Sequence, residues 1–335
     1  MARYDFASDN TAGAAPEAMA ALHAANDGFT SGYGTDTVTA RAADLVRELL
    51  DADADVRFTA SGTASNALAL QALCRPFEAV VAHEHAHVCT DETGAPGFFG
   101  HGLGLLGLPG ASGKIDPPAL EAALVLPDVS YRQSPAALSL TNATEYGTVY
   151  SAEEMAALVA PAKDRGLGVH LDGARLANAA AAGFDLKRLK TLGVDILVVG
   201  GTKAGMLPTE AVVLFDPALS RRFDARLKQA GQLPSKGRFL SAPWIGMLES
   251  GAWLARAAHA NVMARKLAEL MPWPVRHPVQ ANAVFADVPE DAYQRLLGEG
   301  WFVYRFTDGT LRFMCSWATT EAAVEELGEA LARAA

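Results

Sequence analysis

The chain of 335 residues carries a formal net charge of −10, with half of its residues hydrophobic and a fifth charged, so it is long enough to bury a large core and to form two domains. Its acidic balance and scattered basic residues argue against nucleic acid and anionic membrane surfaces as partners. The sequence lacks an apolar run of the roughly 18 residues that a membrane helix needs, lacks an apolar signal-peptide start and has only three widely spaced cysteines, so we expect a cytoplasmic protein with reduced thiols.

Short apolar segments alternate with longer amphipathic ones through the first two thirds of the chain. Several of the short segments are apolar almost throughout, which is typical of strands that are covered on both faces. The alternation predicts an α/β fold in which helices cover both faces of a mostly parallel sheet. The predicted strands are 55–60, 78–84, 136–142, 167–172, 195–201 and 210–215, and the predicted helices are 62–74, 116–126, 151–165, 173–182 and 185–192.

The pattern changes towards the C-terminus. Residues 241–271 read as one long helix, and the proline-rich stretch MPWPVRHP follows it. We expect a boundary near residues 250–275, with a large domain at 1–255 and a small α+β domain at 256–335. The small domain is predicted from short strands at 283–288, 301–306 and 311–316 and from helices at 290–298 and 319–334.

The stretch FTASGTASNALAL (58–70) predicts a phosphate-binding turn. A strand leads into Ser61, Gly62 and Thr63, and a helix follows. Free backbone N–H groups, two hydroxyls and the helix dipole together favour an anion at this point. An ordinary helix N-cap is the alternative interpretation.

The stretch VVAHEHAHVCTDE (80–92) contains the zinc-protease pattern H-E-x-x-H at His83, Glu84 and His87. That pattern binds zinc when both histidines share one helix face, but the β-branched residues before it favour a strand that runs into a loop. On a strand, His83, His85 and His87 would share a face and Glu84 would point away. Three interpretations stay open, namely a three-histidine metal site, a polar strand end, and a histidine that serves a site built mainly elsewhere. We assign no metal ligands.

Two later strands end in chemically useful residues. In VHLDGARL (169–176) a strand ends at Asp172, and in DILVVGGTKAG (195–205) a strand runs into two glycines and Lys203. Ligands of open α/β sheets bind beyond the carboxyl ends of the strands, so both side chains should reach one crevice. With the phosphate-binding turn, they form the set that pyridoxal phosphate needs: a lysine for a Schiff base, an aspartate for the pyridine nitrogen and an anchor for the phosphate.

With these residues in place, the sequence resembles the low-specificity L-threonine aldolases, which are pyridoxal-phosphate enzymes of the aspartate-aminotransferase fold (fold type I). The resemblance covers nearly the whole chain. The motifs DGAR and GGTK with their spacing are fairly specific to this family, whereas the SGT segment is shared more widely. The resemblance rests on FASDN (6–10), SGYGTD (31–36), SGTASNALAL (61–70), AHVCTDETGAPGFF (86–99), NATEYGTVY (142–150), HLDGARLANA (170–179), GGTKAGM (200–206), KQAGQLPSKGRFLSAPW (228–244) and LRFMCSW (311–317).

The resemblance implies roles for residues that match the motifs. Lys203 corresponds to the Schiff-base lysine and Asp172 to the partner of the pyridine nitrogen. Gly62, Thr63 and Arg238 correspond to phosphate ligands.

The resemblance also implies a substrate pocket. Arg312 matches the arginine that binds the substrate carboxylate, and Ser8 and Arg175 match residues that line the same pocket, with Arg175 also beside the cofactor. His87 corresponds to the histidine that stacks on the cofactor ring, which makes the H-E-x-x-H pattern accidental.

One segment departs from the family. Many members have a histidine near the substrate hydroxyl in T-H-N-G, whereas this chain has Glu145 at that place in TEYG (144–147). We therefore expect His87 or Glu145, directly or through water, to remove the β-hydroxyl proton. The threo or erythro preference is open.

The implied reaction is the cleavage of L-threonine, L-allo-threonine and related β-hydroxy-α-amino acids, phenylserine types included, to glycine and an aldehyde. The implied assembly is a homodimer or homotetramer with shared active sites, and Tyr33 and Asp36 lie in a loop near such a boundary. The alternatives are a β-eliminating lyase or aminotransferase of the same fold, a pyridoxal-phosphate protein without turnover, and the metal protein.

Overall fold

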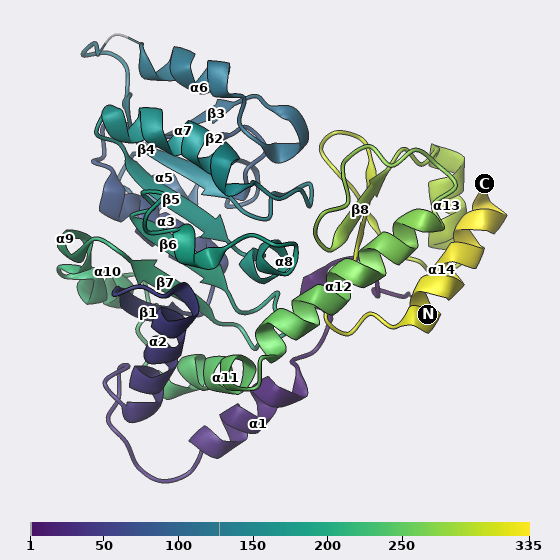
Figure 1. Ribbon diagram of the computed structural model, residues 1–335, viewed down its shortest axis with the longest axis horizontal. Helices are drawn as coiled ribbons and strands as arrows, with labels where there is room; N and C mark the ends of the chain where they lie inside the picture. The colour runs from purple at the N-terminus through teal and green to yellow at the C-terminus, as the bar shows by residue number, and fades with distance from the viewer. Residues whose placement is uncertain (1, 127) are drawn as a thin grey trace.

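Seven strands form one sheet in the order β1-β7-β6-β5-β4-β2-β3 in the computed structural model, which describes residues 2–126 and 128–335 (Figure 1). β7 runs antiparallel to its neighbours β1 and β6, and the other neighbouring pairs are parallel. The predicted mostly parallel α/β sheet is confirmed. Its strands are β1 (Asp55–Thr59), β2 (Glu78–His83), β3 (Gly104–Leu108), β4 (Ser134–Thr141), β5 (Gly168–Gly173), β6 (Ile196–Gly200) and β7 (Glu210–Leu214).

Helices cover both faces of this sheet, which explains why its central strands are apolar throughout. Val198 and Val199 are consecutive on β6, so their side chains point to opposite faces. Val198 shares a core with Leu68 of α3 (Gly62–Leu73), whereas Val199 belongs to the larger core on the other face. Helices that contribute to this second core include α2 (Thr37–Leu50), α6 (Pro117–Leu124) and α7 (Ala152–Asp164).

A second, antiparallel sheet has the strand order β8-β10-β9 and lies beside the first (Figure 1). Val284, Phe313 and Leu327 belong to a separate core that this sheet forms with helices. The predicted small α+β unit is present, while the division at residues 255 and 256 falls within the first turn of α12 and stays a prediction. Its elements are α12 (Ala252–Glu269), β8 (Ala283–Ala286), α13 (Glu290–Gly298), β9 (Tyr304–Arg305), β10 (Leu311–Met314) and α14 (Glu321–Ala334).

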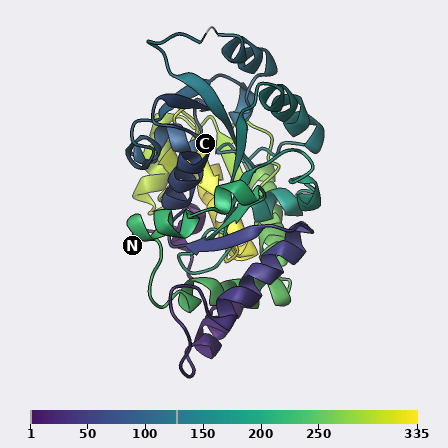
Figure 2. The same cartoon turned by 90° about the vertical axis from the view of Figure 1, so that its left-hand side faces the viewer.

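The N-terminal segment runs from the small sheet towards the large one. The Phe6 carbonyl oxygen accepts a hydrogen bond from the Met314 N–H at 2.9 Å. The chain then passes through η1 (Asp9–Thr11) into α1 (Pro16–Ala25), which lies beside α11 (Arg238–Glu249) at the end of the molecule opposite α6 (Figures 1 and 2). Gly246 of α11 permits this contact, because a Cβ there would lie 2.2 Å from the carbonyl oxygen of Glu17.

Several predicted helices are wrong in length or continuity. The predicted helix at 185–192 is only a 3-10 turn, η3 (Leu186–Arg188), and the predicted helix at 173–182 starts late, as α8 (Leu176–Ala181). The predicted helix at 241–271 is two helices, α11 (Arg238–Glu249) and α12, because the chain breaks at Gly251 with a φ of +73°.

Some elements of the structure are not predicted by the sequence pattern. Strand β3 was not predicted because its glycines, Gly104 and Gly107, have a low preference for strands, and α1 and α2 were not predicted either. No helix within residues 2–126 and 128–335 combines the length and hydrophobicity needed to span a bilayer. The remaining short elements are α4 (His87–Thr90), α5 (Ala95–Phe99), η2 (Ala111–Gly113), α9 (Pro217–Ser220) and α10 (Phe223–Gln229).

Candidate active site

A cavity of about 370 Å³ lies between the carboxyl ends of the central strands and the small sheet. The large sheet and the segments that follow its strands form one side of it, and the hairpin of β9 and β10 forms the other. Most of the predicted site residues meet here. The lining residues are Ser8, Asn10, His87, Asp91, Glu145, Arg175, Lys203, Tyr304, Arg305, Phe306, Thr307 and Arg312.

Asp172 lies buried near the end of β5, beneath this cavity. Its Oδ1 accepts the Ala174 N–H at 2.9 Å, and its Oδ2 accepts the Asn66 amide at 2.8 Å. Burial by itself raises the pKa of the carboxyl, but the neighbouring His170, His87 and Lys203 side chains lower it below its ordinary value. Asp172 is therefore held as an anion, and it is not the N-cap of α8, because Arg175 occupies that position.

Lys203 reaches the cavity from the short connection between β6 and β7. Gly201 makes this turn tight, because a Cβ there would lie 2.4 Å from the carbonyl oxygen of Thr209. The Gly201 N–H also donates to Glu210 Oε2 at 2.8 Å, which anchors the turn to β7. Burial and the neighbouring Arg175 charge lower the pKa of the Lys203 amine. A larger share of neutral amine makes this lysine a better nucleophile.

Gly62 and Thr63 form the first turn of α3, directly after β1. The Ser61 side chain makes no cap hydrogen bond, and the first N–H groups of a helix have no partner within the helix. Together with the helix dipole, these donors favour an anion such as a phosphate. Glu210 lies behind this turn, and burial raises the pKa of its carboxyl to about 7.

Two arginines line the cavity and differ in how their guanidinium groups are paired. Arg175 is held in a two-point ion pair by buried Asp9. Arg312 donates only a long hydrogen bond, from Nη2 to the Ala7 carbonyl oxygen at 3.3 Å, and its Nε has no partner among residues 2–126 and 128–335. Burial and Arg175 lower the pKa of Arg312 to about 10. Arg312 therefore has free N–H groups for a carboxylate, and Ser8 lies in the same wall.

His87 and Glu145 occupy the opposite wall. The His87 backbone N–H donates to Glu145 Oε1 at 2.9 Å, and the Thr141 hydroxyl donates to the same oxygen at 3.1 Å. The Glu145 Oε2 has no hydrogen-bond partner in the described part of the chain. Burial and the nearby Asp172 charge raise the pKa of Glu145. This carboxyl is suited to exchange a proton at Oε2.

The three histidines of the H-E-x-x-H stretch have different partners. His83 ends β2, and its Nε2 lies 3.0 Å from the Gly110 carbonyl oxygen. His85 lies in a turn, with Nδ1 2.6 Å from the Tyr146 hydroxyl, and His87 starts α4. The stretch is not a helix face, so the geometry that makes this pattern a zinc site is not formed.

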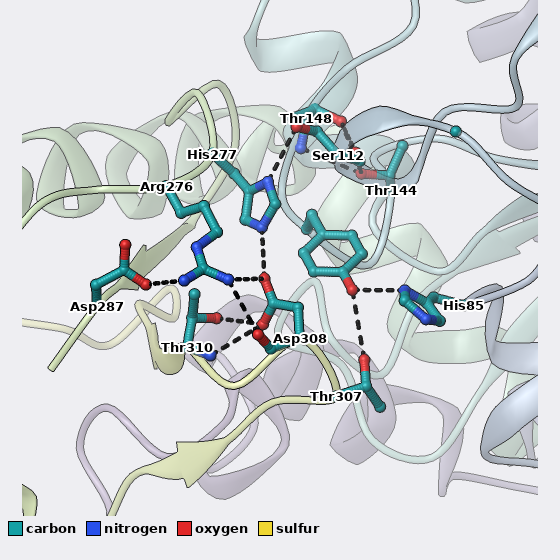
Figure 3. A network of polar contacts seen from close by, with 12 residues as sticks. His85, Ser112, Thr144, Thr148, Arg276, His277, Asp287, Thr307, Asp308 and Thr310 are labelled. Atoms are coloured by element: carbon teal, nitrogen blue, oxygen red, sulfur yellow. Dashed lines mark hydrogen bonds and ion pairs between the residues drawn. The ribbon is translucent and has the colours of Figure 1, made fainter. Parts of the chain in front are cut away.

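A polar network holds the hairpin wall against the large sheet (Figure 3). His277 lies between Asp308 of the hairpin turn, 2.8 Å from its Nε2, and Ser112 of the large unit, 2.9 Å from its Nδ1. The Tyr146 hydroxyl lies 3.4 Å from that of Thr307. Because Tyr146 follows Glu145, the network fixes the hairpin and the Glu145 turn relative to each other.

Arg238 does not line this cavity. It starts α11, and its guanidinium lies 3.4 Å from the Gly28 carbonyl oxygen. The loop that contains Gly28 also carries Phe29, which is fully exposed, and Tyr33, which is half exposed. The Lys228 ammonium lies over the Tyr33 ring.

Three polar residues of the site were not singled out from the sequence. Asp9 holds Arg175, Glu92 lies 2.9 Å from His87 Nδ1, and Asn66 links Glu92 to Asp172. Asn66 and Glu92 stood inside quoted motifs, SGTASN and CTDE, but their pairing joins residues 26 positions apart, which no local pattern reports.

Comparison with known proteins agrees with this geometry. The family model for beta-eliminating lyases matches residues 5–291. A low specificity L-threonine aldolase of Pseudomonas sp. is 48% identical over 96% of this chain and 95% of its own length. The structure of Leishmania major threonine aldolase superimposes with a TM-score of 0.93 and 31% identity, covering 99% of this chain and 100% of that one. Sphingomonas wittichii serine palmitoyltransferase shares the fold at 15% identity, with a TM-score of 0.73 over 98% of this chain and 86% of its own.

Proposed function

The chain belongs to the beta-eliminating lyase family and, within it, to the low-specificity L-threonine aldolases, and from this premise we propose how it acts. It is a pyridoxal-phosphate-dependent carbon–carbon lyase that cleaves L-threonine, L-allo-threonine and related β-hydroxy-α-amino acids, phenylserine types included, to glycine and an aldehyde. The observation that carries the proposal is the meeting of Lys203, Asp172 and free Arg312 N–H groups around one cavity.

The residues around the cavity fit the cofactor. When bound, pyridoxal phosphate supplies an electron-withdrawing ring that takes up the electron pair of the bond that breaks. Lys203 would hold its aldehyde carbon, and anionic Asp172 would keep the proton on its pyridine nitrogen. The free N–H groups at Gly62 and Thr63 would hold the phosphate, and His87 would cover the ring.

Arg312 orients the substrate in this proposal. Its unpartnered Nε and its Nη groups can hold the amino-acid carboxylate at two points, as a planar guanidinium does. Arg175 cannot serve in the same way while Asp9 occupies its Nε and Nη2. Arg175 would instead keep the wall in place beside Ser8.

The proton of the substrate β-hydroxyl passes to His87 or Glu145, directly or through water. As that proton leaves the oxygen, the Cα–Cβ bond breaks and a C=O bond forms in the departing aldehyde. The electron pair of the broken bond stays with Cα, which then takes up a proton to give glycine. The unpartnered Glu145 Oε2 and the part-exposed His87 ring are the proton-holding groups that support this step.

The test is an assay of purified enzyme with L-threonine for acetaldehyde, glycine, 2-oxobutanoate and ammonia. We expect acetaldehyde and glycine in equal amounts and no 2-oxobutanoate. Formation of 2-oxobutanoate with ammonia would indicate β-elimination of water, and transfer of the amino group of threonine to an added keto acid would indicate an aminotransferase. Cofactor binding with no product from threonine would indicate a pyridoxal-phosphate protein without turnover.

We also propose that the chain acts in the cytoplasm as a homodimer or homotetramer with shared active sites. Exposed Phe29, half-exposed Tyr33 and Arg238 lie close together outside the cavity, which supports a subunit contact there. Arg238 of the partner subunit would then complete the phosphate site. Sedimentation equilibrium measures the assembly, and Arg238→Ala should weaken cofactor binding while Arg221→Ala, at an exposed position, should not.

A further inference from the structure

Four polar side chains connect the floor of the cavity to its wall. Asn66 Nδ2 donates to Asp172 Oδ2 at 2.8 Å and to Glu92 Oε1 at 2.9 Å. The same Glu92 oxygen lies 2.9 Å from Nδ1 of His87. The Glu92 side chain has no exposed surface, whereas that of His87 is 37% exposed and lines the cavity.

The chemistry of these groups fixes the direction of each hydrogen bond. A carboxylate only accepts, so the Asn66 group between the two carboxylates must be its NH₂. Burial raises the pKa of Glu92, while its hydrogen bonds with His87 and Asn66 lower it. With this carboxyl ionised, the His87 Nδ1 must for the same reason carry a proton that it donates to Glu92. In neutral imidazole the other nitrogen then has a lone pair, so Nε2 of His87 is the proton acceptor on this ring.

The electrostatic surroundings of His87 come from several elements. Glu92 follows α4, Asp172 ends β5, Glu145 follows β4 and Lys203 follows β6. The hydrogen bond to Glu92 raises the pKa of His87 above its ordinary value against the effect of burial, Asp172 raises it further and Lys203 lowers it. One side of the His87 ring faces the cavity, where cofactor and substrate would bind. On the other, buried side of the ring, its partner is Glu92.

We propose that Glu92 is a positioning residue for the β-hydroxyl proton transfer: it holds the proton on Nδ1 of His87 so that Nε2 accepts from the substrate. Asn66 ties this pair to Asp172, so one buried amide orients both the carboxylate that would hold the pyridine nitrogen and the imidazole that would accept the substrate proton. This inference rests on the proposed function and selects His87, oriented by Glu92, as the proton acceptor.

A purely structural role for Glu92 makes a different prediction. Glu92→Gln keeps the length and an oxygen acceptor but removes the negative charge. If Glu92 only filled space, the variant would behave as wild type. If it orients His87, the pKa of His87 should fall, kcat should drop on the order of tenfold with a smaller change in KM, and the acidic limb of kcat should move to lower pH.

The first measurement is ¹⁵N NMR of the histidine side chains in the protein before and after loading with pyridoxal phosphate, with His87 assigned by its loss in His87→Gln. We expect the Nδ1–H tautomer in wild type, and this needs no Glu92 variant to fold. An Nε2–H tautomer would overturn the proposal. The pH titration then compares Glu92→Gln with the conservative Glu92→Asp, which should restore part of the pKa, and with Glu84→Gln, an exposed carboxylate of the same segment that should change nothing.

The two hypotheses fail separately. If the tautomer and the pKa change follow the prediction but threonine gives no glycine, the proposed reaction is wrong and the His87–Glu92 pairing stands. If glycine and acetaldehyde form but Glu92→Gln leaves the His87 pKa and the acidic limb unchanged, the reaction stands and Glu92 has no positioning role.

Discussion

Arg175 meets Asp9 through two hydrogen bonds, from Nε to Oδ2 at 2.7 Å and from Nη2 to Oδ1 at 3.0 Å, and both side chains are almost fully buried. Arg312, close enough to Arg175 for their charges to interact, has no such carboxylate partner within the part of the chain that the structure describes. The chain therefore separates an arginine that supports the wall from one that is free to bind.

This separation predicts different effects of the same substitution. Arg312→Lys removes a planar two-point donor, so kcat/KM for threonine should fall by about 10- to 100-fold, mainly through KM. Arg175→Lys leaves part of a buried ion pair unmatched, so it should lower the melting temperature, which Arg312→Lys should leave nearly unchanged. Steady-state kinetics and thermal unfolding measure both. Equal effects of the two variants on KM would contradict the assignment.

Asp172→Asn should lower kcat by two to three orders of magnitude. The amide keeps the shape and can still accept the Ala174 N–H, but it loses the negative charge that faces the pyridine nitrogen. The cofactor content, measured by absorbance, should fall much less than kcat. Asp185→Asn, at the N-cap of η3, is the matched control and should keep full activity. Retained turnover in Asp172→Asn would exclude the proposed charge role.

Glu210 should make stability depend on pH. Its pKa is raised to about 7 in the folded state from 4.5, so the unfolded chain loses this proton first as pH rises. The stabilisation of the fold by the protonated form is present below pH 4.5 and is lost as pH rises to about 7. Glu210→Gln keeps an acceptor for the Gly201 N–H but has no ionisable group. The melting temperature of the variant, relative to that of wild type, should therefore rise between pH 5 and pH 7.5. A constant difference between the two proteins would rule out Glu210 as the source.

His277→Gln should change the substrate preference. The substitution breaks the link between Ser112 and Asp308 and loosens the hairpin wall that carries Phe306 and Thr307. We expect kcat/KM for threonine to fall several-fold and the ratio of phenylserine to threonine to rise, because a looser wall accepts larger side chains. His23→Gln, at an exposed position of α1, should leave the ratio unchanged. A uniform loss for both substrates would show that His277 supports the fold alone.

The sequence contains the parts of the site that follow from local patterns. Asp172 and Lys203 could be predicted because each follows a buried strand of a parallel sheet, where the carboxyl ends meet. Asp9 and Glu92 could not, because their partners are distant in sequence and no periodicity marks them. Arg238 shows a further limit, since it lies outside the cavity within one chain and its predicted phosphate contact depends on a partner subunit and stays a prediction.

The helices show the same distinction. A strong apolar period predicted α13 with accurate bounds, because this helix presents one face to a core. Gly251 ended the predicted long helix at 241–271, because a backbone with positive φ overrides the amphipathic pattern that continues through it.

The two sides of the cavity come from different sheets, and this gives the enzyme two regions that can change independently. Lys203 and Asp172 stand on the seven-stranded sheet, whereas Tyr304, Phe306 and Thr307 belong to the hairpin of the small one. Substitutions in the hairpin can alter which aldehyde fits without disturbing the residues that retain the cofactor. Natural variation and laboratory evolution of substrate range should therefore accumulate in the hairpin, while the floor tolerates little change.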